Sequence, residues 1–323
     1  MKVFVTRPVP EAGLKLLRDK GYEVVINTAA AERPAEKEEL MAGVKGADAI
    51  LSVLTDKIHA DVIDAGLPNL KIIANFAVGY DNVNVESAKK NNIVVTNTPG
   101  VLTETVAEHT FGLLMAITRR IPEGDKFARS GKFTAWGPKL LLGMDMAGKT
   151  LGIVGLGRIG SRVAHFAIRG FEMKVVYTDV QPNPEFEKNY GAIFVKTIDE
   201  FLPQCDYVSL NVPLNDSTKH LMNETRFKLM KSSAYLINTS RGPVIDELAL
   251  AKALKERVIK GAAIDVFEFE PKISPELMEL DNIVMTPHTA SASEETRDKM
   301  AMMAAQNIIE VLEGRPAPNK ISD

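Results

Sequence analysis

The sequence predicts an α/β protein with two doubly wound parallel-sheet domains, one inserted into the other. Short apolar runs alternate with amphipathic stretches on both sides of residue 150, a pattern typical of parallel sheets covered by helices. A glycine-rich turn of the form G-x-G-x-x-G comes only after residue 150, so a separate domain is expected ahead of it. The chain ends in a long apolar-periodic stretch, which predicts a helix that needs a partner surface.

Composition limits the possible classes of protein. The 323 residues are 45% hydrophobic and 25% charged, enough for a globular chain with two sizeable cores. The net charge of −3 gives no general attraction to nucleic acid or to an anionic membrane. The single cysteine, Cys205, excludes a disulfide framework and a multi-cysteine metal site. No signal region or membrane-length apolar run is present, so we expect a cytoplasmic protein.

The first hundred residues predict a small parallel sheet covered by helices. Apolar runs predict strands at residues 3–5, 22–26, 49–51, 70–73 and 93–95. Helical patterns separate them at residues 10–20, 34–44, 60–65 and 85–90. The turn cluster at residues 97–100 ends this region. A long helix is expected next, with Thr103 as its N-cap and a break or kink at Pro122, and residues 130–146 should be irregular.

The glycine turn follows a predicted strand, Leu151 to Val154, and opens a helical pattern at residues 158–169. Each of the three glycines has a physical role in such a turn. Gly155 permits the tight turn, Gly157 lets the backbone approach a pyrophosphate, and Gly160 lets helix and strand pack closely. The helix N-terminus then presents free N–H groups to phosphate. Strand, glycine turn and helix in this order predict a dinucleotide site of the Rossmann type.

Asp179 follows the next predicted strand, residues 174–177, and lies 19 residues beyond Gly160. A carboxylate there can accept a hydrogen bond from a ribose 2′-hydroxyl and would repel the 2′-phosphate of NADP. The sequence therefore predicts NAD as cofactor, with NADH preferred over NADPH.

Alternation resumes to the end of the chain. Strands are predicted at residues 207–210, 234–237, 261–264 and 283–285, and helices at residues 225–230, 247–256 and 293–313. We expect the last helix to cross back to the first domain. The predicted domains are therefore residues 1–100 with 290–323, and residues 101–289.

Three predicted strands of the second domain end in polar groups. Arg241 follows one strand, the acids from Asp265 to Glu270 follow the next, and His288 follows the last. Taken singly, each has a plain structural alternative: a surface cation, a loop acid and a satisfied histidine. Cofactors of this kind bind outside the carboxyl ends of the strands, and the three groups together suit hydride transfer to a 2-oxo acid. Arginine binds a carboxylate through two parallel hydrogen bonds, imidazolium is a general acid near neutral pH, and a carboxylate favours and orients that imidazolium.

These residues carry a family resemblance. Ser240-Arg-Gly-Pro243, Glu270-Pro271, Thr286-Pro-His288 and Gly155-Leu-Gly-Arg-Ile-Gly160 resemble the signature of the D-isomer-specific 2-hydroxyacid dehydrogenases. The resemblance runs from Lys2 to the C-terminus. It is nearest to the glyoxylate/hydroxypyruvate reductase subgroup through residues 75–81, 97–103 and 136–143. It implies a Rossmann NAD-binding domain inserted into a flavodoxin-like substrate domain.

The resemblance also implies roles for residues. Arg241 would bind the substrate carboxylate and polarise the carbonyl, His288 would be the acid/base, and Glu270 its partner. Backbone N–H groups of the loop holding Val78 and Gly79 would bind the substrate carboxylate, and Leu54 would lie in a second substrate-side loop. Positions that contact NAD would be Gly155, Gly157, Arg158, Ile159, Gly160, Asp179, Val212, Pro213, Thr218, Thr239, Ser240, Arg241, Asp265 and His288.

Some positions depart from the family or stay open. The reductases often have Ser-Arg near the position of Asp179, and usually Asp where this chain has Asn84, which we expect to be structural. Cys205 is expected to be a buried thiol. Trp136 either packs within the chain or reaches the active site of a partner subunit in a homodimer. The remaining histidines show no metal spacing and receive no role: His59, His109, His165 and His220.

The leading hypothesis is an NADH-dependent reductase of glyoxylate and hydroxypyruvate, with two domains that close over the substrate. D-3-phosphoglycerate oxidation is the next alternative, although no dense Lys/Arg patch marks a phosphate site. D-lactate oxidation is a further option, and formate oxidation fits the residues less well. A non-enzymatic alternative is an NAD-sensing corepressor that binds protein partners on the same fold.

Overall fold

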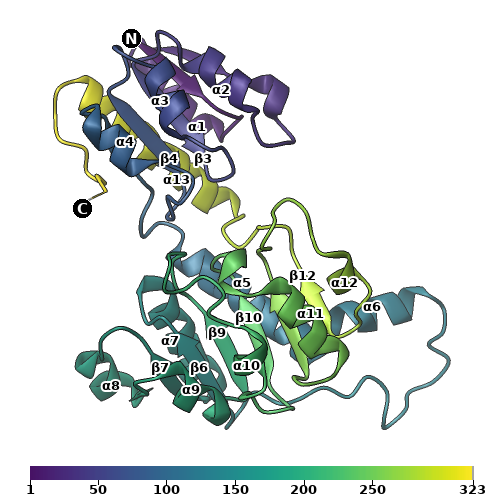
Figure 1. Cartoon of the computed structure of the whole chain (residues 1–323). Coiled ribbons are helices and arrows are strands. Elements are labelled where there is room, and N and C mark those ends of the chain that lie inside the picture. The colour runs from purple at the N-terminus through teal and green to yellow at the C-terminus, as the bar shows by residue number, and fades with distance from the viewer. Residues whose placement is uncertain (322–323) are drawn as a thin grey trace. The chain divides into compact units, whose positions relative to one another are not determined.

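A computed structural model describes residues 1–321 of the chain. The chain divides into two compact units (Figure 1). Unit 1 comprises Met1–Leu102 and Ala292–Asp323, and unit 2 comprises Thr103–Ser291. Within residues 1–321, no helix has the length and apolar character needed to cross a membrane.

Unit 1 is built on one parallel sheet of five strands in the order β2-β1-β3-β4-β5. The strands are β1 (Lys2–Val5), β2 (Glu23–Ile26), β3 (Ala49–Val53), β4 (Ile72–Phe76) and β5 (Val94–Thr96). The helices between them are α1 (Glu11–Asp19), α2 (Lys37–Val44), α3 (Ala60–Ala65) and α4 (Val85–Lys90). This is the flavodoxin-like order, in which the direction of winding reverses between β1 and β3.

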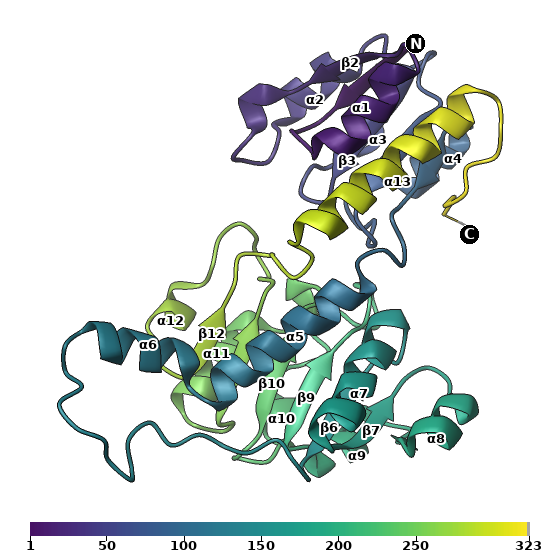
Figure 2. The same cartoon turned by 180° about the vertical axis from the view of Figure 1, so that it is seen from behind.

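The last helix, α13 (Glu294–Leu312), lies alongside α1 and against β4 in unit 1 (Figure 2). Glycine and alanine make this close packing possible. A Cβ atom on Gly13 of α1 would lie 2.4 Å from the carbonyl oxygen of Ala301. The first and last segments of the chain therefore share one core, because the apolar face of α13 is buried there.

Unit 2 contains a parallel sheet of seven strands in the order β12-β11-β10-β9-β6-β7-β8. Its strands are β6 (Thr150–Val154), β7 (Lys174–Thr178), β8 (Ile193–Phe194), β9 (Tyr207–Leu210), β10 (Tyr235–Asn238), β11 (Gly261–Ile264) and β12 (Ile283–Met285). The winding reverses between β6 and β9, as in dinucleotide-binding sheets. The predicted fold class, two doubly wound parallel-sheet domains, is confirmed.

Helices cover both faces of this sheet: α5 (Thr103–Thr118), α6 (Ile121–Arg129), α7 (Arg158–Phe171), α8 (Pro184–Tyr190), α9 (Ile198–Phe201), α10 (Glu224–Phe227), α11 (Glu247–Lys255) and α12 (Pro275–Met278). Helices α5 and α7 lie side by side (Figure 2). Phe111 of α5 stacks on Phe171 of α7 with ring centroids 5.1 Å apart.

The structure corrects the predicted elements in a few places. Helix α5 begins at Thr103 itself, so this residue is the first helical residue rather than the N-cap. The break before Pro122 falls at Arg120, which adopts φ 54°, and Pro122 then lies in the first turn of α6, where its missing N–H costs nothing. Four short elements were not predicted, because segments of two to seven residues give too little periodicity: α8, β8, α9 and α12.

Candidate active site

The three glycines after β6 meet three different environments. Gly155 has φ +88°, a conformation that favours glycine, and so turns the chain at the strand end. A Cβ on Gly160 would lie 2.0 Å from the carbonyl oxygen of Gly155, so α7 packs directly on the turn. A Cβ on Gly157 would meet no atom within 4 Å. The turn therefore leaves open space at the N-terminus of α7, the kind of place where helix N–H groups can bind a phosphate.

Asp179 follows β7 and is fastened to the glycine turn. Its Oδ2 accepts the N–H of Leu156 at 2.7 Å, and its Oδ1 accepts the N–H of Val180 at 2.6 Å. A carboxylate has about four lone-pair sites, so both oxygens keep capacity for a ribose hydroxyl. Arg158 is exposed and Ile159 half-buried in the first turn of α7.

The loop after β9 lies across the point where the winding reverses. Val212 approaches the turn so closely that a Cβ on Gly155 would be 2.9 Å from its Cγ1. The Thr218 hydroxyl donates to the carbonyl of Pro213 at 2.6 Å and accepts the N–H of Asn215 at 2.9 Å. These two hydrogen bonds of Thr218 stabilise the conformation of the loop that holds Val212 and Pro213, which are predicted cofactor positions.

The end of β10 is organised by Asn238, a buried residue that the sequence analysis did not single out. Its Oδ1 accepts the N–H and the hydroxyl of Ser240, and its Nδ2 donates to the carbonyl of Arg241 at 3.0 Å. The Thr239 hydroxyl bonds to Thr110 of α5 at 2.9 Å. Arg241 leaves this loop half-buried, with Nη1 donating to the carbonyl of Ser240.

Gly242 brings the arginine loop against the loop that follows β11. A Cβ on Gly242 would lie 1.9 Å from the carbonyl carbon and oxygen of Phe267 and 2.5 Å from the nitrogen of Glu268. No other residue type fits this contact without movement of the backbone. The loops that carry Arg241 and Glu270 are therefore packed together.

His288 and Glu270 form the expected pair. Nδ1 of His288 lies 2.9 Å from Oε2 of Glu270, and each side chain is 24% exposed. The other oxygen, Oε1, accepts the N–H of Phe267 at 2.9 Å. Because an ionised carboxylate only accepts hydrogen bonds, Nδ1 is the donor, and Nε2 is left to exchange a proton.

Asp265 is fully buried and joins the loops after β11 and β12. Its Oδ1 accepts the Thr286 hydroxyl at 2.6 Å and the N–H of Thr289 at 2.8 Å, and its Oδ2 accepts the N–H of Ala290 at 2.8 Å. Burial opposes ionisation of Asp265, but the donors, including His109, outweigh burial and hold its pKa below the usual value. The backbone around His288 is thus fixed by a buried carboxylate.

His109 of α5 belongs to this cluster. Its Nε2 lies 3.1 Å from the Thr286 hydroxyl and 3.5 Å from Oδ1 of Asp265. No sequence signal indicated this contact, because it joins residues 177 positions apart through tertiary packing.

In unit 1, Val78 and Gly79 follow β4, and Leu54 follows β3. The Asn97 amide donates to the carbonyl of Val78 at 2.7 Å, and the Asn75 amide donates to that of Gly79 at 2.9 Å. The N–H groups of Val78 and Gly79 have no acceptor among residues 1–321. With the carbonyls held, these N–H groups can bind an anionic oxygen.

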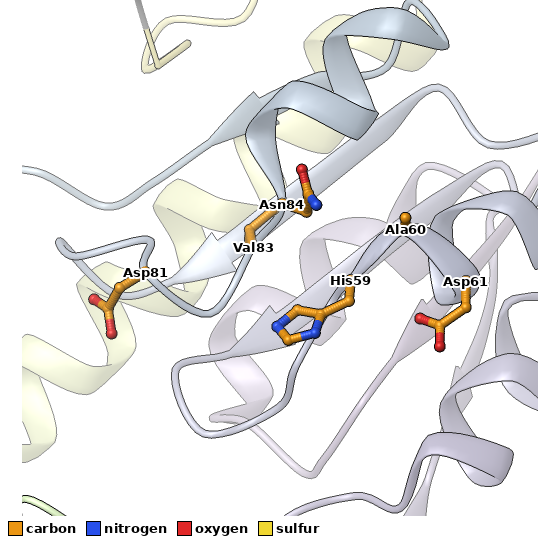
Figure 3. A pocket seen from close by; sticks show the side chains of 6 residues that line it. All are labelled: His59, Ala60, Asp61, Asp81, Val83 and Asn84. Carbon is orange, nitrogen blue, oxygen red and sulfur yellow. The ribbon is translucent and has the colours of Figure 1, made fainter. Parts of the chain in front are cut away.

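A surface depression of about 550 Å³ lies at the far end of the same loop (Figure 3). It is lined by His59, Ala60, Asp61, Asp81, Val83 and Asn84, none of which was predicted as a site residue. Asn84 caps α4 by accepting the N–H of Ser87, which is the structural role expected for it. In the described part of the chain, no three His, Cys, Asp or Glu residues are arranged to hold a metal.

Two other predictions concern residues outside these loops. Trp136 is 80% exposed within a segment without helix or strand, so it does not pack into the core of its own chain. Cys205 is fully buried, and burial raises the pKa of its thiol to about 12, as expected for an inert thiol.

Comparison with known proteins agrees with this geometry. Residues 111–290 match the model of the NAD-binding domain of the D-isomer-specific 2-hydroxyacid dehydrogenases. The glyoxylate reductase of Korarchaeum cryptofilum is 48% identical over 99% of this chain and 96% of its own length. This chain belongs to the D-isomer-specific 2-hydroxyacid dehydrogenase family. It is an NAD(P)-dependent oxidoreductase of 2-hydroxy acids, similar to the glyoxylate reductase subgroup, and the resemblance inferred from its motifs is confirmed.

Solved structures with this architecture match the chain over its whole length. The TT0316 protein from Thermus thermophilus is 42% identical, with a TM-score of 0.93 over the full length of both chains. A glyoxylate/hydroxypyruvate reductase from Sinorhizobium meliloti is 32% identical, with a TM-score of 0.88 over 99% of this dehydrogenase and 96% of that chain. That reductase is NADPH-dependent and was solved with NADP and malonate.

Proposed function

We propose that this dehydrogenase reduces glyoxylate and hydroxypyruvate with NADH. The observation that carries the proposal is the contact between the His288 imidazole and the Glu270 carboxylate, together with the packing of the loop that holds Glu270 against the loop that holds Arg241. A cation for the substrate carboxylate and a proton donor for the new hydroxyl are the two groups that the reaction requires.

A bound nicotinamide supplies the hydride when the 2-oxo acid is reduced. Arg241 binds the carboxylate and polarises the ketone oxygen. His288 donates a proton from Nε2 to that oxygen, while Glu270 holds Nδ1 and stabilises the imidazolium. Asp265 fixes the backbone after His288 through the N–H groups of Thr289 and Ala290.

The preference for NADH rests on Asp179. Its carboxylate is held beside the glycine turn by two backbone N–H groups, where it would accept a hydrogen bond from a ribose 2′-hydroxyl and repel a 2′-phosphate. The remaining cofactor positions predicted above lie in the first turn of α7 and on the loops after β6, β9, β10, β11 and β12, and they are assigned to the nucleotide by the family resemblance.

On the substrate side, we assign the carboxylate to the N–H groups of Val78 and Gly79 as well as to Arg241, and a contact with the substrate side chain to Leu54. D-lactate remains an alternative substrate, since one methylene changes specificity by only about 1–3 kcal/mol, and D-3-phosphoglycerate remains the alternative within the same family.

We also propose that the active form is a homodimer in which Trp136 reaches the partner subunit. Trp136, Phe133 and Leu142 are exposed apolar side chains on one segment of unit 2. An apolar hollow of about 480 Å³ lies between α5 and α7, lined in part by Phe111, Met115 and Phe166. Exposed aromatic side chains and exposed apolar hollows are both typical of an interface between subunits.

Turnover with a panel of 2-oxo acids tests the function directly. Loss of NADH absorbance is measured with glyoxylate, hydroxypyruvate, pyruvate and 3-phosphohydroxypyruvate. We expect His288→Ala to lower kcat mainly, and Arg241→Ala to raise KM as well, because one residue transfers a proton and the other binds the acid. No turnover with any of these acids at saturating NADH would refute the proposal.

A further inference from the structure

The loop after β11 carries two glutamates, and each meets an imidazole from a different loop. Glu270 contacts His288, as described above. Glu268, two residues earlier, has its Oε1 2.6 Å from Nε2 of His220. His220 was given no role from the sequence, and its contact with Glu268 stands outside the proposed catalytic set.

We propose that Glu268 is a positioning residue for the reaction, which, together with His220 and Glu247, holds Glu270 and Arg241 in their working places. The inference rests on the roles proposed above for Arg241, Glu270 and His288. The carboxylate of Glu268 bonds to His220 and to the N–H of Glu247, and it takes no part in the contact between His288 and Glu270.

Glu268 and Glu247, the first residue of α11, hold each other's backbone through a clamp of reciprocal hydrogen bonds. Oε2 of Glu268 accepts the N–H of Glu247 at 3.0 Å, and Oε2 of Glu247 accepts the N–H of Glu268 at 2.7 Å. Oε1 of Glu247 also accepts the N–H of Ser274 at 2.8 Å. Glu247 is only 3% exposed, so its carboxylate ties both ends of the loop to the start of α11.

The clamp fixes the peptide groups next to Glu270. The N–H of Phe267 donates to Glu270, and the next N–H, that of Glu268, donates to Glu247. Two consecutive peptide groups are thus held by two different carboxylates. This fixes the backbone path from which Glu270 reaches His288, because rotation of either peptide would break one of these hydrogen bonds.

Two contacts connect the loop of Glu268 to the loop that carries Arg241. The N–H of His220 donates to the carbonyl of Pro243 at 2.8 Å. Gly242 lies against the backbone of Phe267 and Glu268. With the hydrogen bond between His220 and Glu268, the three loops that carry Glu268, His220 and Arg241 each contact the other two.

Two substitutions test the proposal, with NADH-linked turnover and NADH affinity as readouts. Because a displacement of about 1 Å can cost about 100-fold in rate, Glu268→Ala should lower kcat by about 10- to 100-fold and raise KM for the 2-oxo acid. The Kd for NADH should stay within about twofold, since the glycine turn and Asp179 lie on other strands of the sheet.

His220→Asn removes only the imidazole contact. His220 has φ 49°, and asparagine tolerates this left-handed conformation. The side chain of His220 is 40% exposed, so the variant should fold, and its kcat should fall by about 3- to 10-fold through loss of one charge-assisted contact. This variant keeps the inference testable if Glu268→Ala does not fold.

Asp206→Ala is the matched control. Like Glu268, Asp206 accepts a backbone N–H, from Thr150 at 2.9 Å, and a side-chain nitrogen, Nζ of Lys231, contacts its other oxygen, but Asp206 precedes β9 and so lies at the amino ends of the strands. Asp206→Ala and Glu268→Ala should both lower thermal stability, because each removes an acceptor of a backbone N–H, but Asp206→Ala should leave kcat and KM at wild-type values.

A double-mutant cycle separates positioning from stability alone. In a Glu270→Ala background, Glu268→Ala should lower kcat clearly less than it does in the wild type, because its route to His288 is already lost and only its hold on the Arg241 loop remains. Independent, multiplicative losses, or wild-type kcat in both Glu268→Ala and His220→Asn, would overturn the inference. Near-normal kcat in Glu270→Ala would instead overturn the proposed catalytic pair.

Discussion

Gly157 and Gly160 lie three residues apart at the start of α7, and the same substitution at each should have different consequences. At Gly157, a methyl group would meet no protein atom within 4 Å, and the backbone conformation, φ −69°, is open to alanine. Gly157→Ala should therefore fold normally, with a stability cost of at most about 1 kcal/mol for the poorer N-cap residue. The methyl group would, however, occupy the space assigned to the pyrophosphate.

The size of the binding defect follows from the contacts at stake. A hydrogen bond from a backbone N–H to a charged phosphate contributes about 1.5–3 kcal/mol. Loss of one such bond should weaken NADH binding about 10- to 150-fold, since about 1.4 kcal/mol corresponds to a factor of ten. The Kd is measured by NADH fluorescence titration, alongside thermal unfolding of each variant.

Gly160→Ala and Gly170→Ala complete the comparison within one helix. At Gly160 the methyl group would fall 2.0 Å from a backbone oxygen, so the variant should lose about 1–3 kcal/mol by overpacking and bind NADH poorly as well. At Gly170 nothing lies within 4 Å, and alanine should be neutral or stabilising by up to about 1 kcal/mol. NADH binding of wild-type strength by Gly157→Ala would refute the assignment of this turn to the pyrophosphate.

Three further predictions concern other parts of the molecule. Asp179→Ser should shift the ratio of kcat/KM for NADH over NADPH toward NADPH by about 10- to 100-fold, because a charge repelling the 2′-phosphate is removed; an unchanged ratio would show that selectivity lies elsewhere. The lowered pKa of Asp265 means that its ionised form contributes stability above the unfolded value of about 3.9, which is lost as pH falls through the folded value. At pH 7, Asp265→Asn should therefore lower the free energy of unfolding by about 1–3 kcal/mol. In urea unfolding below pH 4, this free energy should fall less steeply with pH for the variant than for the wild type. Equal slopes for the two proteins would contradict this. Trp136→Ala should leave the stability of the monomer within about 0.5 kcal/mol because the side chain is exposed, but raise KM if it serves the partner subunit; an unchanged KM would argue against that role.

Much of the active site could be anticipated because it is encoded locally. The glycine turn, its strand and Asp179 form a pattern within about thirty residues, and each glycine has the environment that its position in the motif predicts. Arg241, Glu270 and His288 could be proposed as the catalytic set because each follows a strand, and the carboxyl ends of parallel strands lie on the same side of the sheet. Short elements such as α8 and α12 were missed because they are stabilised by tertiary packing more than by their own periodicity.

The residues that hold the catalytic groups could not be found in this way. Asn238, His109, Glu268 and Glu247 are ordinary polar residues in the sequence. Their partners come from other loops: Thr286 for His109, and His220 for Glu268. A buried polar group forms its hydrogen bond with whichever partner the fold brings near, and the local sequence pattern does not indicate that partner.

The sequence by itself determined the fold class, the glycine turn and the chemical types of the proposed catalytic groups, because strand periodicity, glycine spacing and the residues at strand ends are local properties. The tertiary structure alone decided which carboxylate meets which imidazole. Glu268 and Glu270 are two residues apart and chemically identical, yet one contacts His220 and the other His288. The packing of Gly242 against Phe267 and the clamp of Glu247 on the same loop set the backbone direction that separates them.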